Sequence, residues 1–167
     1  MNKKITFNDK MQSGYYFLTE KMGENFDSRF NPELSPKEML MMGVFGGRYM
    51  RDCTSEFPED WFENAKFAID KKNSKLNYFK VDASLSLREW NRKGWIHPAD
   101  PRGWFQWYCR YFYGRRITGE DERQIKRWCG MKRHVSAIKN NCPPKMLDCR
   151  IKQRQALLHW AYDSRNY

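Results

Sequence analysis

One stretch of the sequence combines side chains that bind phosphate with side chains that stack on flat rings. Seven aromatic residues occupy the ten positions 104–113, and arginines interrupt or flank them at Arg102, Arg110, Arg115 and Arg116. Guanidinium groups hold phosphate oxygens through paired hydrogen bonds, and aromatic rings stack on nucleobases. The stretch therefore predicts a surface that binds a nucleic acid or another phosphorylated molecule.

On a helix, most of these aromatic side chains fall on two adjoining faces, so we expect most of them in the core. The polar stripe that remains consists of Arg102, Gln106, Arg110 and Tyr113. We predict that its arginines contact phosphate. The alternative is a buried or half-buried ion pair with an acid of the segment 120–122.

Basic residues outside the stripe extend the predicted surface. The full set of predicted phosphate-binding residues is Arg48, Arg102, Arg110, Arg115, Arg116, Arg123 and Arg127. The predicted base contacts are Tyr49, Trp104, Gln106 and Trp107. Their rings can stack on an extruded base, and an amide or hydroxyl can bond a base edge.

Two carboxylates are candidates for acid–base catalysis, namely Asp100 and Asp121. A carboxyl group beside tryptophans can exchange a proton or stabilise a cation. An aspartate directly before a proline, as Asp100 is, is also the usual N-cap of a helix. Neither a P-loop, a dinucleotide fingerprint nor a nucleophile motif occurs, so whether the chain is an enzyme stays open.

The cysteine and histidine spacing does not predict a metal site. Cys129, His134, Cys142 and Cys149 form a C-x4-H-x7-C-x6-C pattern, which fits none of the common zinc motifs. We expect no metal and no other cofactor. Because no apolar segment follows the basic N-terminus, we also expect no export signal, reduced thiols and a cytoplasmic location.

Length and charge predict one domain with an uneven surface. The chain has 167 residues, of which 40% are hydrophobic, and no apolar run is long enough for a membrane span. Residues 1–87 have balanced charges, so the whole net charge of +11 lies in residues 88–167. A basic half of this kind is typical of proteins that bind polyanions, although a solvated basic surface without a partner is the alternative.

Helix start and stop signals predict the elements that position these residues. Ser35-Pro36, Ser84 or Ser86, Asp100-Pro101 and Thr118-Gly119 are start signals, and Gly114 is a stop. Strand signals are weak. We therefore predict a mainly α protein, a single compact helical domain of about six to eight helices, with helices near 10–22, 36–46, 58–62, 84–90, 101–113, 119–130, 132–140 and 144–162.

Five blocks of the sequence resemble a known family of phage, viral and fungal proteins. The blocks are 43–49, 94–96, 100–111, 114–116 and 121–128. The family is linked to thymine hypermodification in DNA, in particular through the helical domain that accompanies phage 5-hydroxymethyluracil DNA kinases. The resemblance covers about residues 36–130 and implies a helical domain that works on DNA, distantly similar to helix-hairpin-helix DNA glycosylases. The kinase P-loop half and a glycine-rich hairpin of the glycosylase kind are missing from the sequence.

Three functions follow as hypotheses. The first is a DNA-binding helical protein of phage type that acts on or beside a modified thymine such as 5-hydroxymethyluracil. The second is a small enzyme that binds a nucleotide or another phosphorylated metabolite in one closed pocket where arginines converge. The third is a phage interaction protein that docks on an acidic host partner through an apolar patch beside the basic face. The sequence leaves the oligomeric state open.

Overall fold

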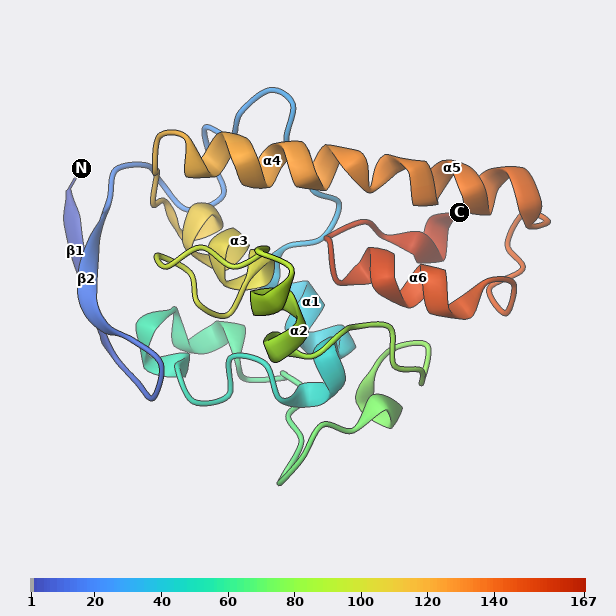
Figure 1. Ribbon diagram of the computed structural model, residues 1–167, viewed down its shortest axis with the longest axis horizontal. Helices are drawn as coiled ribbons and strands as arrows, with labels where there is room; N and C mark the ends of the chain where they lie inside the picture. Colours follow the sequence, from blue (N-terminus) through green and yellow to red (C-terminus); the bar gives the residue numbers. More distant parts are fainter. Residues whose placement is uncertain (1) are drawn as a thin grey trace.

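The computed structural model describes residues 2–167, and its secondary structure is mixed (Figure 1). Two antiparallel strands and six α-helices occur within these residues. Helices α4 and α5 are separated only by Met131 and run on as one long rod in Figure 1. The elements are β1 (Lys3–Asn8), β2 (Ser13–Leu18), α1 (Pro36–Met42), α2 (Leu87–Arg92), α3 (Trp104–Tyr113), α4 (Glu120–Gly130), α5 (Lys132–Asn141) and α6 (Ile151–Leu158).

The prediction of a mainly α domain with six to eight helices is wrong. Helical residues, including short 3-10 turns, make up about 40% of the chain, which forms five helical bodies and a two-stranded sheet in a compact mixed α/β fold. Much of the region between α1 and α2 is irregular, and the helix expected at 58–62 is only the 3-10 turn Glu59–Trp61. Tertiary contacts, rather than local helix signals, hold these segments in place.

The helix expected at 10–22 is instead the second half of a β-hairpin. Asp9 closes the turn, because its Oδ1 accepts hydrogen bonds from the backbone N–H groups of Met11 and Gln12. Along β2, Leu18 is buried while Tyr15 and Phe17 are exposed, which is the alternation of a strand with one face on the core. Because the exposed residues Tyr15 and Phe17 are aromatic, the sequence does not alternate between apolar and polar residues here.

The predicted helix start at Ser35 is confirmed, and of the two serines that the sequence offered for the next helix, Ser86 is the cap. Ser35 and Ser86 each accept a hydrogen bond from a backbone N–H three residues on, and the glutamate at that position bonds back to the serine N–H. The start at Asp100 is wrong. Helix α3 begins at Trp104 after Gly103, whose φ is 94°, and the carboxylate of Asp100 binds arginines instead.

Most of the aromatic residues of helix α3 are core, as predicted. Trp107 and Tyr108 are fully buried. Phe30, from the irregular segment before α1, lies with its ring centroid 5.5 Å from each of theirs and 5.0 Å from that of Trp128 on α4. Clusters of tilted and edge-to-face rings of this kind stabilise a core beyond the area they bury.

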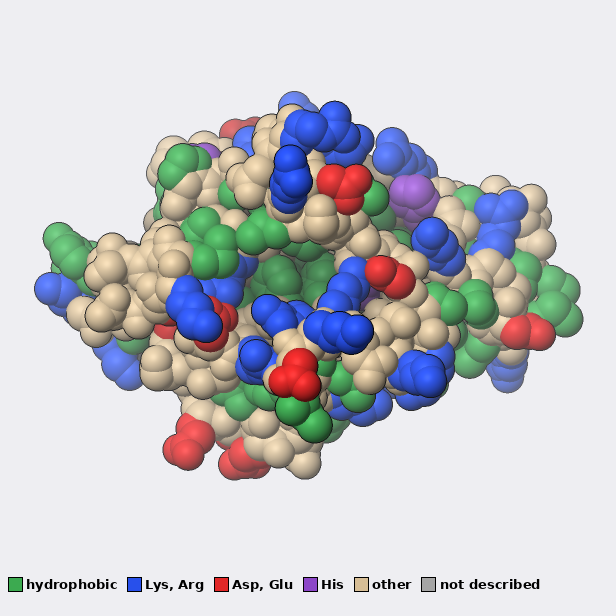
Figure 2. Space-filling view, turned by 60° about the horizontal axis from the view of Figure 1, so that its bottom comes forward, with side chains coloured by type: hydrophobic (Ala, Val, Ile, Leu, Met, Phe, Trp, Pro, Cys, Tyr) green, Lys and Arg blue, Asp and Glu red, His purple; other side chains and the backbone are tan. Residues whose placement is uncertain are grey.

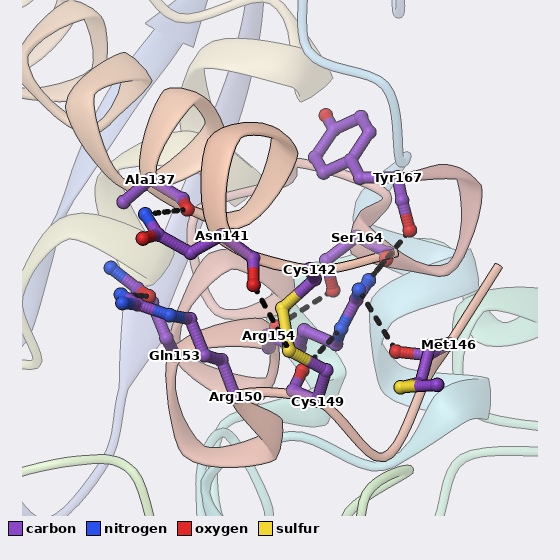
Figure 3. The surroundings of a disulfide bond; sticks show 10 residues. All are labelled: Ala137, Asn141, Cys142, Met146, Cys149, Arg150, Gln153, Arg154, Ser164 and Tyr167. Carbon is purple, nitrogen blue, oxygen red and sulfur yellow. Dashed lines mark hydrogen bonds between the residues drawn. A yellow bond between two sulfur atoms is a disulfide. The ribbon is translucent and has the colours of Figure 1, made fainter. Parts of the chain in front are cut away.

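The C-terminal segment differs from its prediction in two ways. Cys142 and Cys149 form a disulfide, so the expectation of reduced thiols is wrong for this pair. The disulfide closes an irregular loop, and α6 therefore starts only at Ile151 rather than near 144. Figure 3 shows Arg154 of α6 beside this disulfide, where its guanidinium donates to the backbone carbonyls of Met146, Cys149, Ser164 and Tyr167.

Across residues 2–167 no helix is both long enough and apolar enough to cross a lipid bilayer.

Candidate functional site

Two of the predicted phosphate-binding arginines lie inside the protein. Arg110 donates to Glu56 through Nε (2.6 Å) and Nη2 (3.0 Å), and its Nη1 lies 3.1 Å from Asp100 Oδ1. Arg115 binds both carboxylate oxygens of Asp100 at 2.8 and 2.6 Å. All four side chains are buried. Both guanidinium groups are buried and paired with carboxylates, so neither of them faces a solvent-borne phosphate.

Arg102 is placed in the same way. Its two Nη atoms donate to both oxygens of Asp52 (2.8 and 3.1 Å), and Nη2 also lies 3.1 Å from Asp9. Burial opposes the charge of Arg102, but the pKa is raised by the hydrogen bond to Asp52 and the neighbouring negative charges. The structure thus shows the kind of ion pair that the sequence offered as the alternative. The acidic partners are Asp9, Asp52, Glu56 and Asp100, however, and not residues of the segment 120–122.

The candidate acid–base residues are engaged in structural contacts. Asp100 is fully buried between two arginines. Asp121 accepts hydrogen bonds from Trp107 Nε1 and from the backbone N–H of Ile117, both at 2.8 Å. Burial raises the pKa of Asp121, and these two hydrogen bonds oppose the rise. Neither carboxylate lines the pocket described below.

The other predicted phosphate ligands are mostly engaged as well. Arg123 donates to both oxygens of Glu120 at 2.8 Å. Arg116 lies over the ring of Tyr111 at 3.8 Å and donates to backbone carbonyls. Arg48 is exposed and donates to the carbonyl of Asp70. The remaining member of the set, Arg127, borders a pocket.

Three of the four predicted base contacts are also engaged with other parts of the chain. Tyr49 donates its hydroxyl hydrogen to the carbonyl of Arg102. Gln106 is buried and accepts from the backbone N–H of Arg102 at 3.0 Å. Trp107 is buried, and its Nε1–H donates to Asp121. Trp104 is the predicted base contact that reaches the same pocket as Arg127.

This pocket has a volume of about 230 Å³ and walls that are largely aromatic. It is built from the segment 83–85, helix α2 and the connector after it, the start of α3, and the end of α6. Figure 2 shows a hollow with hydrophobic side chains inside it and lysines or arginines around it. Its aromatic side chains are Phe45, Trp90, Trp95, Trp104, Phe105 and Trp160.

Three cations border the aromatic pocket. Arg127 lies over the rings of Trp95 and Trp160, at 5.9 and 5.2 Å from the centroids. Lys93 Nζ lies 5.2 Å from the centroid of Trp95. Lys72 Nζ lies 3.0 Å from the hydroxyl of Ser84, which lines the pocket, and forms an ion pair of 2.6 Å with Asp82. The entrance therefore combines aromatic faces with the positive charges of Arg127 and Lys93.

Arg127 differs from the buried arginines in its counter-charges. Among the described residues no carboxylate lies within 4 Å of Arg127, although its guanidinium donates to Gln124 and to the carbonyl of Trp95. Burial, and then the charge of Arg123, lower the pKa of Arg127 to about 10. An anion at this place would offset both effects, because it would neutralise a charge that is partly desolvated.

His159 on the pocket wall is a neutral imidazole. It is buried, with its ring stacked on Phe45 at 4.3 Å. Burial is the main cause that lowers its pKa to about 3, and the charge of Lys72 adds to the effect while Asp82 opposes it. At neutral pH the ring therefore acts as one hydrogen-bond donor and one acceptor.

Sequence patterns did not identify Lys72 or Lys93 as site residues, and they placed His159 on a helix face rather than in a pocket. They come from three segments that are distant along the chain and meet only in the folded protein. One local signal was present, since Lys93 stands between Trp90 and Trp95 in the connector before α3. The connector was interpreted as a link between helices rather than as the wall of a pocket.

The sequence matches no protein-family model, no curated protein and no solved structure at a significant level. The likeness to DNA glycosylases, which the family resemblance implies, therefore has no support from a known fold.

Proposed function

We propose that this chain is a DNA-binding protein that acts on or beside a modified thymine, and that it binds DNA with the face around the aromatic pocket. The single observation that carries the proposal is an aromatic hollow bordered by Lys72, Lys93 and Arg127. A DNA strand carries both groups that would fit this site, a flat base that can stack in the hollow and phosphates that can pair with the cations at its border. The resemblance of residues 36–130 to proteins of thymine hypermodification supports the choice of the modified base.

The energetics favour an unstacked base. Each base that stacks on aromatic side chains contributes roughly 1–3 kcal/mol to single-strand binding. A base in a duplex must first leave the stack, which costs a few kcal/mol and costs least in damaged, mismatched or single-stranded DNA. We therefore expect tighter binding to single strands than to an unmodified duplex.

A nucleotide enzyme is the less favoured alternative. That hypothesis requires several arginines to converge on one pocket. In the structure Arg102, Arg110 and Arg115 are paired with carboxylates of the chain and do not converge on an open space. Among the arginines of residues 2–167, Arg127 is the one that lines the aromatic pocket.

The test is fluorescence anisotropy with labelled single- and double-stranded DNA, with and without 5-hydroxymethyluracil, over a salt series. We expect the affinity to fall with salt, by about 0.7 to 0.9 in log K per log salt for each phosphate contact. Arg127→Ala and Lys93→Ala should each weaken binding about fivefold and lower this slope by about one contact. Lys37→Ala is the matched control, because this exposed lysine on α1 pairs with Asp60 and does not line the pocket.

The result has clear alternatives. Absence of binding at low salt, or equal affinity of wild type and Arg127→Ala, would contradict the proposal. Binding without preference for 5-hydroxymethyluracil would leave a DNA-binding protein and would remove the modified thymine from the proposal.

A further inference from the structure

Two buried side chains on the wall of the aromatic pocket keep a hydrogen-bond donor unpaired. Trp104 is a buried member of the wall, and its indole Nε1–H has no partner among the described residues. The second donor belongs to His159 and follows from the tautomer of its ring.

The neighbours of His159 determine which ring nitrogen carries the proton. Its Nε2 accepts from the backbone N–H of Phe45 at 3.3 Å and lies 3.0 Å from Gln155 Nε2. Gln155 Oε1 accepts from the backbone N–H of Phe79, which identifies the nitrogen end of the amide as the one that faces the histidine. Because two donors point at Nε2, the proton of the neutral ring is on Nδ1. Within residues 2–167 no hydrogen bond is formed by Nδ1.

Unpaired donors at a pocket wall select for a ligand with acceptors. Buried N–H groups are nearly always hydrogen-bonded in folded proteins, so the unpaired indole N–H of Trp104 calls for an explanation. Trp104 and His159 offer donors only, and Arg127 at the border adds more. A ligand that presented an amino group to this wall would leave donors facing donors.

We propose that the aromatic pocket binds a planar ring that carries carbonyl oxygens, a keto pyrimidine of the thymine or uracil type, with Trp104 Nε1–H and His159 Nδ1–H donating to the ring oxygens. The indole rings of Trp90, Trp95 and Trp160 supply the stacking surface. The delivery of this ring within DNA rests on the proposed function, whereas recognition of the ring by the pocket does not.

Cytosine is the discriminating competitor. It has the size of uracil and stacks in the same way, but an amino group replaces the carbonyl oxygen at position 4. Sites built to hydrogen-bond one such group reject the analogue that lacks it. We expect an oligonucleotide of about eight thymidines to bind at least tenfold more tightly than one of cytidines.

The test compares oligo-dT with oligo-dC by anisotropy and follows the tryptophan indole resonances by ¹H–¹⁵N NMR on titration with free thymidine and deoxycytidine. Thymidine should shift the Trp104 indole resonance, which is assigned from its loss in Trp104→Phe. His159→Gln keeps an acceptor for the N–H of Phe45 and removes the Nδ1 donor. In both variants the preference for dT over dC should fall below threefold.

Trp90→Phe is the matched control, since it reduces the stacking surface and leaves both donors in place. It should weaken dT and dC binding alike and keep their ratio. The comparison of oligo-dT with oligo-dC on wild type needs no variant, so the test does not depend on the variants folding.

The outcomes separate the two proposals. Equal binding of dT and dC, or an unshifted Trp104 resonance at saturating oligo-dT, would overturn the keto-ring inference and leave DNA binding intact. A shift with thymidine in a protein that binds no oligonucleotide would support the inference and overturn the proposed function.

Discussion

Arg110 on α3 and Glu56, 54 residues earlier in the chain, form a two-point ion pair in the interior, with contacts of 2.6 and 3.0 Å. Each side chain is 1% exposed. The pair joins the central helix to the 3-10 turn Thr54–Glu56, and the hydroxyl of Tyr16 on β2 donates to the same glutamate. A residue that the sequence nominated for phosphate binding is thus a structural anchor.

Removal of one member of this pair should destabilise the fold strongly. Glu56→Ala would leave Arg110 buried with an unpaired charge, and a broken buried pair costs about 3–5 kcal/mol. Urea denaturation should show this loss. Lys37→Ala is the control, because its partner Asp60 is exposed and such pairs contribute about 0–1 kcal/mol. A loss for Glu56→Ala as small as that for Lys37→Ala would contradict the assignment.

Stability should fall as the pH drops below the ordinary pKa of histidine, and His159 should cause part of the fall. Its pKa is 6.5 in the unfolded chain and about 3 in the folded protein. Between these values the unfolded state binds more protons, so acid favours unfolding. Between pH 7 and pH 5 the free energy of unfolding of wild type should fall by at most about 2 kcal/mol more than that of His159→Gln, because the glutamine does not titrate.

The measurement is urea denaturation of both proteins at several pH values. The pKa values of carboxylates such as Asp52 and Asp163 are lowered by Arg102 and Arg165. Protonation of these carboxylates at lower pH reduces the free energy of unfolding of both proteins equally, so their contribution cancels in the difference. Parallel losses between pH 7 and pH 5 would show that the imidazole is accessible to protons in the folded state.

The disulfide between Cys142 and Cys149 should stabilise the C-terminal segment. It closes a short loop beside Arg154 (Figure 3), and loops of this length contribute about 2 kcal/mol through the unfolded chain. The double variant Cys142→Ser, Cys149→Ser should lose this amount in urea denaturation under oxidising conditions. Dithiothreitol should lower the stability of wild type to the level of the double variant. Cys129→Ser, which removes a free thiol and keeps the disulfide, should match wild type with and without dithiothreitol.

Gly114 should be sensitive to a methyl group because of a neighbouring backbone. A Cβ at Gly114 would lie 2.2 Å from the carbonyl oxygen of Glu20, and φ is +124°. Gly119 also has a positive φ, of +83°, but a Cβ there would meet nothing within 4 Å. We expect Gly119→Ala to cost about 1 kcal/mol of backbone strain and Gly114→Ala to cost at least about 2 kcal/mol more. Equal thermal shifts for the two variants would contradict the close approach of the hairpin to α3.

Local signals predicted local structure well. The serine caps at 35 and 86 and the stop at Gly114 depend only on residues within one helical turn, and the structure confirms them. The hairpin was missed because its strands are specified by one buried face and by the Asp9 turn, and exposed Tyr15 and Phe17 obscured the period of two. A strand of this kind depends on the surface that it covers.

The sequence by itself determined the aromatic core around α3, because apolar residues at this spacing fall on adjoining faces of a helix and must be buried. It could not determine where the arginines point. Arg110 and Arg127 are alike in sequence, since each has aromatic neighbours and lies in the basic half of the chain. Tertiary structure placed Glu56 and Asp100 against Arg110 and placed Trp95 and Trp160 beside Arg127. Charge pairing acts over a few ångströms in space, whatever the separation along the chain, so only the fold decides which guanidinium is satisfied internally and which is left beside a pocket.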